Sequence, residues 1–440
     1  MLLHSTNDAS LRADFATAVF QALPTDGGLY LPVDVQPLPS TFWRKLPTLG
    51  LPEIAAAITR HLLDDELGTA VIDGIIERAI DFPTPLVELA GRSPRQYVLE
   101  LFHGPSMAFK DFGARFMAGV MNELCARQGR RLTILVATSG DTGGAVAAGF
   151  HGSENIEVVI LYPRGGVSDI QEAQLTTLEG NVRALRVDGT FDDCQALVKR
   201  AFLDDELRAR LDISSANSIN ILRLIPQTFY YVEGYRQWLA LGHDTAPVFC
   251  VPSGNFGNLT AGVLAAQLGM PVRKFIAATN ANDTAHRYAQ TGEYSPKTSV
   301  KTLSNAMDVG APSNFPRLRE LLGSTWNMFK DAVYVATFGD GATELEMAEV
   351  FTTTRAARGE GYVLDPHTAV GTLALREYQT TVEAAPGIVL GTAHPGKFLP
   401  DVERVLGREI GLPPALERVR MLPRTVVDIP NDYAAFRESI

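Results

Sequence analysis

The chain has 440 residues, of which 46% are hydrophobic and 20% charged, a balance typical of about two or three folded domains and not of a disordered chain. Its 39 Lys and Arg residues stand against 50 Asp and Glu residues, a net charge of −11, and no basic block offers a path for a nucleic-acid backbone. No apolar run is long enough to span a membrane and the N-terminus lacks a signal-peptide pattern, so we expect a cytoplasmic protein without a membrane or nucleic-acid partner.

The cysteines exclude two further classes of protein. Cys125, Cys194 and Cys250 are widely spaced and odd in number. This pattern supports neither a disulfide framework nor a CxxC metal site. We therefore expect small core residues and no bound metal.

Residues 1–92 are predicted to form a separate N-terminal unit. Pro-rich stretches come first, and a helical section follows over Pro52–Ala79. The composition of this segment differs from that of the rest of the chain.

From about residue 95, short apolar runs alternate with helical patterns. Apolar residues at helical spacing predict a helix over Phe109–Gln128, with Gly129 as its stop. This alternation predicts an α/β fold of β-α-β units in open, mostly parallel sheets, with ligands at the carboxyl ends of the strands. The predicted strands are Arg131–Ala137, Ile156–Tyr162, Val182–Val187, Pro247–Val251, Lys274–Ala278, Ala332–Ala336 and Gly387–Gly391.

The α/β part is predicted to divide into two domains. The polar stretch Ser214–Asn220, which precedes a long helical pattern, is the candidate boundary. We expect a smaller domain over residues 93–215 and a larger one over residues 216–440.

Lys110 is the first candidate for chemistry. It follows the apolar run Tyr97–Phe102 and lies in the first turn of the predicted helix, between the aromatic residues Phe109 and Phe112. A lysine among apolar groups near a helix N-terminus favours the neutral amine that a Schiff base requires. The alternative interpretation is an ordinary solvated lysine at a helix start.

Three later loops also follow predicted strands. The segments TSGDTGG (138–144) and PSGNFGN (252–258) each precede a helix, and their small residues let backbone amides approach an anion. The third loop, TAHPGKF (392–398), begins with the hydroxyl of Thr392. Taken singly, each is as well explained by a tight turn or a helix cap.

Several common motifs are absent. The chain has no GxxxxGK[ST], GxGxxG, HExxH or GxSxG motif in the required context, which argues against several nucleotide-binding and hydrolytic enzyme classes. An early lysine, a Gly-Asn phosphate loop and a late hydroxyl are instead the three anchors that pyridoxal phosphate needs.

Longer segments carry a specific resemblance. ELFHGPSMAFKDFGARFMA, TSGDTGGAVA, NSINILRL, VPSGNFGNLTAG, SNAMDVGAPSNFPR and GTAHPGKF, in this order, closely resemble the threonine synthase family in its bacterial and fungal branch. The resemblance covers about Ser5 to Phe398. It implies a tryptophan-synthase-like fold of type II with two α/β units and an N-terminal extension.

The resemblance also implies a cofactor site for pyridoxal 5′-phosphate. Lys110 matches the lysine that forms the Schiff base, and Thr392 matches the partner of the pyridine nitrogen. A neutral hydroxyl there makes the ring a weaker electron sink than a carboxylate would. The residues that match the phosphate loop are Gly254, Asn255, Phe256 and Asn258.

The implied reaction converts O-phospho-L-homoserine and water into L-threonine and phosphate, by elimination at Cγ and addition of water at Cβ. Lys110 is the implied proton carrier. We assign Asp141 no contact with the cofactor's phenolic oxygen, because a carboxylate would repel it unless the two share a proton. The implied carboxylate site is formed by Ser139, Gly140, Asp141 and Thr142, and the candidates for the substrate phosphate are Asn217, Ser218, Asn220 and Arg223.

Alternatives stay open at this point. Arg223 is equally compatible with a surface helix position, and His394 and Lys397 with structural roles. A related pyridoxal phosphate lyase that releases a ketoacid and ammonia would share most of these motifs. A silent homologue with a binding role is disfavoured by the intact Lys110, SGNFGN and Thr392.

Overall fold

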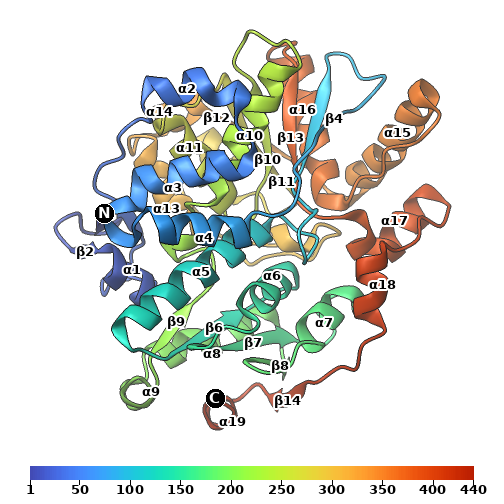
Figure 1. Cartoon of the computed structure of the whole chain (residues 1–440). Helices are drawn as coiled ribbons and strands as arrows, with labels where there is room; N and C mark the ends of the chain where they lie inside the picture. Colours follow the sequence, from blue (N-terminus) through green and yellow to red (C-terminus); the bar gives the residue numbers. More distant parts are fainter.

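Two parallel sheets and one small antiparallel sheet, surrounded by helices, make up the computed structural model, which describes residues 1–440 (Figure 1). In the view of Figure 1 the smaller parallel sheet lies below the larger one. The N-terminal helices lie beside them at the upper left.

The N-terminal unit combines the antiparallel sheet, of order β2-β1-β3, with four helices. The helical section predicted over Pro52–Ala79 is confirmed as two helices, separated at Gly68, whose φ of +82° suits glycine. The elements are β1 (Leu2–Ser5), β2 (Arg12–Asp14), α1 (Phe15–Gln21), β3 (Tyr30–Pro32), α2 (Ser40–Lys45), the 3₁₀ helix η1 (Leu46–Thr48), α3 (Leu51–Leu67) and α4 (Thr69–Ala79).

The larger sheet has the strand order β12-β11-β10-β13-β5-β4 and is parallel except for the edge strand β4. Its strands are β4 (Leu86–Glu88), β5 (Gln96–Glu100), β10 (Val248–Pro252), β11 (Lys274–Thr279), β12 (Val333–Thr337) and β13 (Gly387–Gly391). The helices in this part of the chain are α10 (Gln227–Ala240), α11 (Gly257–Gln267), α12 (Thr284–Thr291), η3 (Asn305–Met307), α13 (Phe315–Leu321), α14 (Trp326–Ala332), α15 (Asp340–Arg358), α16 (Pro366–Thr381), η4 (Pro395–Phe398) and α17 (Leu399–Leu406).

The smaller sheet, of order β14-β8-β7-β6-β9, is parallel throughout. Its strands are β6 (Leu132–Ala137), β7 (Ile156–Pro163), β8 (Val182–Asp188), β9 (Ile213–Ser215) and β14 (Val427–Pro430). The helices around it are α5 (Lys110–Gln128), α6 (Asp141–Phe150), α7 (Asp169–Thr176), α8 (Phe191–Phe202), α9 (Asp205–Arg210), η2 (Ile221–Arg223), α18 (Pro414–Arg420) and α19 (Tyr433–Glu438).

The predicted strands are confirmed to within one residue at each end, and the helix predicted from Phe109 begins at Lys110. Their sequences are readable because strands of a parallel sheet are buried on both faces and are apolar throughout. β7, for example, has only one exposed residue, Glu157.

Sheet membership does not follow the boundaries expected at residues 92/93 and 215/216. Strand β5 of the expected smaller domain pairs with β13 of the larger sheet. Strand β14, at the other end of the chain, pairs with β8 of the smaller sheet. The chain therefore crosses between the two sheets more often than a division into consecutive segments allows.

Arg317 connects the N-terminal unit to both other parts of the molecule. This fully buried side chain on α13 donates to the carbonyls of Tyr30, Ser218 and Ile219 and to the side chain of Asn314. No carboxylate lies close enough to pair with it. Three backbone carbonyls from two segments far apart in the sequence thus depend on one guanidinium.

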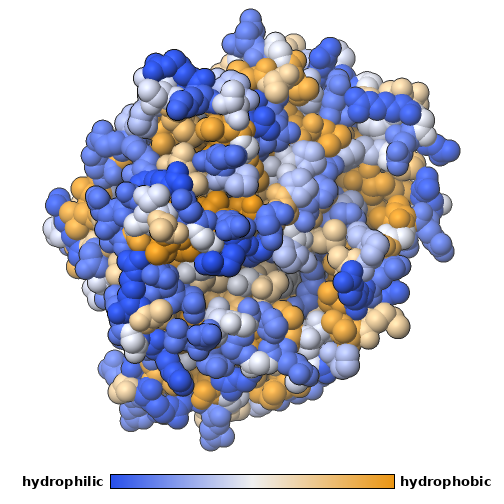
Figure 2. All heavy atoms as spheres, in the orientation of Figure 1, coloured by the Kyte–Doolittle hydropathy of each residue, from blue (hydrophilic) through white to orange (hydrophobic).

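The surface is mixed in character. Figure 2 shows hydrophilic residues over most of the visible face, with hydrophobic patches between them. None of the helices combines the length and the apolar character needed to traverse a bilayer.

We expect the substitution Arg317→Met to destabilise the fold, because it leaves three carbonyls without their donor, and a buried acceptor without a partner costs about 1–3 kcal/mol. Thermal unfolding measures the effect. The matched change at the exposed Arg210, Arg210→Met, should leave the midpoint almost unchanged. Equal midpoints for the two variants would contradict this role for Arg317.

Candidate active site

The largest group of polar residues that line one pocket lies where the carboxyl ends of four strands meet. Loops after β5, β6, β10 and β13 contribute Lys110, Ser139, Asn255 and Thr392 to its wall. Strands β5, β10 and β13 belong to the larger sheet and β6 to the smaller one, so the pocket lies at the carboxyl edges of both sheets, which is the usual ligand position in open α/β folds. The segments singled out from the sequence are therefore brought together.

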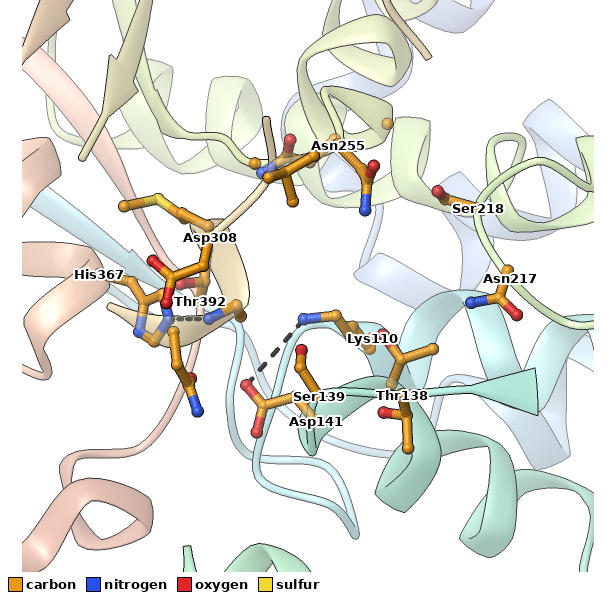
Figure 3. Close-up of a pocket in the computed structure, with 18 of the residues that line it drawn as sticks. Lys110, Thr138, Ser139, Asp141, Asn217, Ser218, Asn255, Asp308, His367 and Thr392 are labelled. Atoms are coloured by element: carbon orange, nitrogen blue, oxygen red, sulfur yellow. Dashed lines mark hydrogen bonds and ion pairs between the residues drawn. The ribbon is translucent and has the colours of Figure 1, made fainter. Parts of the chain in front are cut away.

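Lys110 begins α5 and points into this pocket (Figure 3). Its side chain is 16% exposed, and its Nζ lies 4.8 Å from the centre of the Phe109 ring. Burial lowers the pKa of Lys110 to about 8, although the charge of Asp141 acts in the opposite direction. A substantial fraction of neutral amine is thus present at mildly alkaline pH, which supports the interpretation of Lys110 as a nucleophile and base.

Asp141 is held by a second lysine. Its Oδ1 lies 2.7 Å from Nζ of Lys397 and accepts a hydrogen bond from Gln171, while its Oδ2 lies 4.0 Å from Nζ of Lys110. Burial favours the neutral acid, but the charges of Lys397 and Lys110 outweigh it and hold the pKa of Asp141 well below its usual range. The sequence predicts no more than a structural role for Lys397, because a local motif contains no sign of a contact with Asp141, which is more than two hundred residues away.

The N-terminus of α6 offers free amides to the same pocket. Ser139, Asp141 and Thr142 line the pocket, and their N–H groups have no acceptor within the chain. Gly140 differs from the prediction: its N–H donates to Oγ1 of Thr138, and the residue does not line the pocket. Thr138, which the sequence analysis did not assign, shapes this turn by also accepting from Gly143.

The loop before α11 is a second group of free amides. The N–H groups of residues 255–258 have no acceptor within the chain, and Phe256 adopts a left-handed conformation with φ of 61°. The side chain of Asn258 is used inside the loop, since it donates to the carbonyl of Pro252 and caps Leu259. Asn255 accepts from Ser313, which fixes the loop to the segment before α13. An anion fits such a helix N-terminus.

Thr392 lies at the end of β13, on the pocket wall. Its carbonyl accepts from the N–H of Phe109, and its hydroxyl has no hydrogen-bond partner in the chain. His394, two residues later, is structural: its Nδ1 accepts from Gly396, and burial lowers its pKa to about 4. The position of Thr392 agrees with the predicted ring-nitrogen partner.

A further segment, Asn305–Val309, lines the pocket opposite Lys110 and was given no role from the sequence. His367 supports it. The Nε2 of His367, which Figure 3 labels, accepts from the N–H of Ala306. Its Nδ1 lies 2.9 Å from Oδ1 of Asp365. Because Nδ1 faces the carboxylate, Nε2 is the ring atom that accepts from the segment. The residues belong to a motif quoted above, but only the fold shows their contacts.

The four candidates for the substrate phosphate divide into two groups. Asn217, Ser218 and Arg223 line the pocket. Asn220 does not: it is fully buried, its amide donates to the carbonyls of Val19 and Ser215, and its oxygen caps η2. The prediction for Asn220 is therefore wrong, since the fold uses all of its polar atoms.

Arg223 is not a surface residue. It is 4% exposed, and burial lowers its pKa to about 10, so it remains charged at neutral pH. One nitrogen donates to the carbonyl of Ala216, whereas its Nε has no acceptor. It packs against Gly113 on the helix of Lys110, where a Cβ atom would lie 2.6 Å from this Nε. A cation with an unused donor thus lies beside the candidate base.

Family models match the whole length of the chain. A model described as "Pyridoxal-phosphate dependent enzyme" matches residues 78–392. Models for the threonine synthase N terminus and C-terminal region match residues 3–80 and 368–440.

Individual relatives agree with these matches. The chain is 44% identical to threonine synthase of Haemophilus influenzae over 438 residues (99% of each chain) and 43% identical to that of Escherichia coli (100% of this chain and 99% of the relative). The crystal structure of the Escherichia coli enzyme superposes with a TM-score of 0.90 at 42% identity, over 100% of this chain and 99% of the other. A structure of threonine synthase from Brucella melitensis with bound pyridoxal phosphate gives 0.89 at 33% identity, over 100% and 98%. Because these relatives match almost from end to end, the chain belongs to the threonine synthase family of pyridoxal-phosphate dependent enzymes.

Proposed function

We propose that this protein converts O-phospho-L-homoserine and water into L-threonine and phosphate, with pyridoxal phosphate as its cofactor. The observation that carries the proposal is the pocket itself. It combines a lysine of lowered pKa with two helix N-termini whose amides are free, and with a buried arginine whose Nε is unpaired. These groups suit an amino acid that carries a phosphate.

The residues fit the cofactor. We propose that Lys110 holds its aldehyde carbon, that the free amides at Asn255, Phe256 and Asn258 bind its phosphate, and that the Thr392 hydroxyl binds its ring nitrogen. Gly254 lets the loop lie close to η3, because a Cβ there would come within 2.8 Å of the Ala306 carbonyl. When bound, the cofactor supplies an electron-accepting ring that stabilises negative charge on the substrate carbons.

The substrate's two anionic groups would bind at different places. The free amides of Ser139, Asp141 and Thr142 are proposed to bind the carboxylate, since they lie at a helix N-terminus. Arg223 and Ser218, with Asn217, are proposed to bind the phosphate, because a guanidinium and neutral donors suit a phosphomonoester. The substrate is then oriented by both ends.

Lys110 is proposed to move the protons. Its amine removes the proton at Cα and later one at Cβ, for which a base of pKa about 8 is well suited near neutral pH. Release of phosphate from Cγ, followed by protonation at Cγ and addition of water at Cβ, completes the reaction. Arg223 stabilises the charge that develops on the departing phosphate.

The direct experiment is to incubate the purified protein with pyridoxal phosphate and O-phospho-L-homoserine and to identify the products. We expect threonine and phosphate in equal amounts, and no turnover by Lys110→Ala. Lys274→Ala, a change at a lysine far from the pocket, serves as the control. Release of a ketoacid and ammonia instead of threonine would favour the related lyase activity and overturn the proposal.

The two glycines of the cofactor loop should differ in their tolerance of a side chain. A Cβ at Gly254 would meet the backbone of η3 at 2.8 Å, whereas one at Gly257 would meet only side-chain atoms, of Asn314 at 3.3 Å and of Ser218 at 3.5 Å. We expect Gly254→Ala to weaken cofactor binding by about tenfold or more, a loss of about 1.4 kcal/mol, and Gly257→Ala to have a smaller effect. Titration of cofactor absorbance measures both affinities, and equal losses would contradict the geometry.

Substitutions of Thr392 test how its side chain influences the electron-accepting strength of the cofactor ring. A carboxylate in Thr392→Asp would favour a proton on the ring nitrogen and strengthen the electron sink, so threonine should form more slowly and more ketoacid should appear. Thr392→Ser keeps a neutral hydroxyl and should retain most activity. The ratio of threonine to ketoacid in a single turnover is the measurement. An unchanged ratio in the Asp variant, with cofactor bound, would show that Thr392 does not set the electronics.

The proposed compartment is the cytoplasm. It is supported by the three cysteines, which are buried free thiols, as expected of a protein folded in a reducing environment.

A further inference from the structure

Lys397 is a lysine without exposed surface, and the reaction proposed above does not use it. It lies in η4, five residues after Thr392, and its side chain is 0% exposed. Its Nζ lies 2.7 Å from Oδ1 of Asp141 and donates to the carbonyl of Ser106 at 2.8 Å. Burying an ammonium is costly unless a charge and hydrogen bonds compensate it, so this position demands an explanation.

Two lysines share the carboxylate that Lys397 contacts. The Oδ1 atom of Asp141 faces Lys397 and Gln171, and the Oδ2 atom faces Lys110 at the longer distance of 4.0 Å. The shorter, hydrogen-bonded contact is with Lys397. Lys110 therefore forms only a long ion pair with the carboxylate, which Figure 3 marks, whereas Lys397 forms the short contact.

We propose that Lys397 is a positioning residue for Lys110: by binding Asp141 at short distance, it keeps the ion pair between this carboxylate and the Lys110 amine long and leaves that amine free to react. The proposal deepens the function proposed above. It rests on that function only in that the Lys110 amine is taken to act as nucleophile and base. Nothing in the contacts of Lys397 requires it to touch the substrate or the cofactor.

The charged groups that face Lys110 predict how its pKa changes when Lys397 is lost. Burial lowers the pKa of Lys110 to about 8; Asp141 and Asp365 act to raise it, and Lys397 and Arg223 act to lower it. Loss of Lys397 would remove one repelling cation and would also allow Asp141 to approach Lys110 more closely than the present 4.0 Å. Both effects raise the pKa of Lys110, so at neutral pH a smaller fraction of its amine is neutral.

The test measures the titration of Lys110 in the full-length protein without added cofactor. Trace labelling with acetic anhydride over a range of pH, followed by quantification of the Lys110 peptide, gives the midpoint of its reactivity. We expect Lys397→Met to raise this midpoint by about one pH unit, which is about a tenfold loss of reactive amine near neutral pH. The control, Lys274→Met, should not change it.

A second pair of variants separates charge from folding. Lys397→Arg keeps the cation and should keep the midpoint, whereas Lys397→Gln keeps a polar side chain without charge and should raise it even if Lys397→Met folds poorly. Asp141→Asn added to either neutral variant should bring the midpoint down again, because the competing carboxylate is gone.

An unchanged or lowered midpoint in folded Lys397→Met or Lys397→Gln would overturn the proposal. Since this readout needs no turnover, a failure of the proposed reaction would appear separately, as absence of threonine formation by the unmodified protein. A purely structural role for Lys397 would lower the thermal midpoint of unfolding without moving the titration of Lys110.

Discussion

The buried carboxylate of Asp141 is the contact on which the pocket depends. Asp141 begins α6, which follows strand β6 of the smaller sheet. Lys397 lies in η4, which follows strand β13 of the larger sheet. A buried charge that loses its partner is strongly destabilising, so the pair can persist only if the two sheets keep this separation. The distance between the two sheets also determines the position of Lys110, which follows strand β5 and lies across the pocket from residues 305–309. The ion pair between Asp141 and Lys397 thus holds the two sheets in the arrangement that also fixes the surroundings of the Lys110 amine.

The local charge of the pocket differs from that of the whole chain. The net charge of −11 would suggest a molecule that repels anions, yet the pocket contains Lys110 and Arg223 and is bounded by the N-termini of α6 and α11. Fixed amides and buried cations act at short range and in a low dielectric, whereas exposed carboxylates are screened by solvent and salt. A molecule with two anionic groups, such as a phosphorylated amino acid, is therefore compatible with an acidic protein.

The sequence predicted the strands and the four loops well because a parallel sheet buries its strands on both faces and gathers their following loops at one edge. It did not predict β14, whose residues are mostly exposed and lack an apolar run, and this strand makes the chain return to the smaller sheet. Within the loops, the motifs predicted which segments line the pocket, but not which polar groups of each residue face it. Gly140 and Asn220 lie in the right segments, yet their polar groups are used by the fold. Lys397 depends on a partner 256 residues away, for which no local pattern exists.

The environment of Arg223 supports the phosphate site proposed above, beside Lys110. Gly113, one turn after Lys110, leaves the space that the guanidinium occupies, and the Nε of Arg223 is buried without an acceptor. A buried donor without an acceptor in the chain costs about 1–3 kcal/mol, and the neighbouring cation of Lys110 adds its repulsion. A phosphomonoester would supply both the acceptor oxygens and the opposing charge. Under that proposal, part of the free energy that the fold loses at this position would be regained on binding, and the site would favour substrates that carry a phosphate.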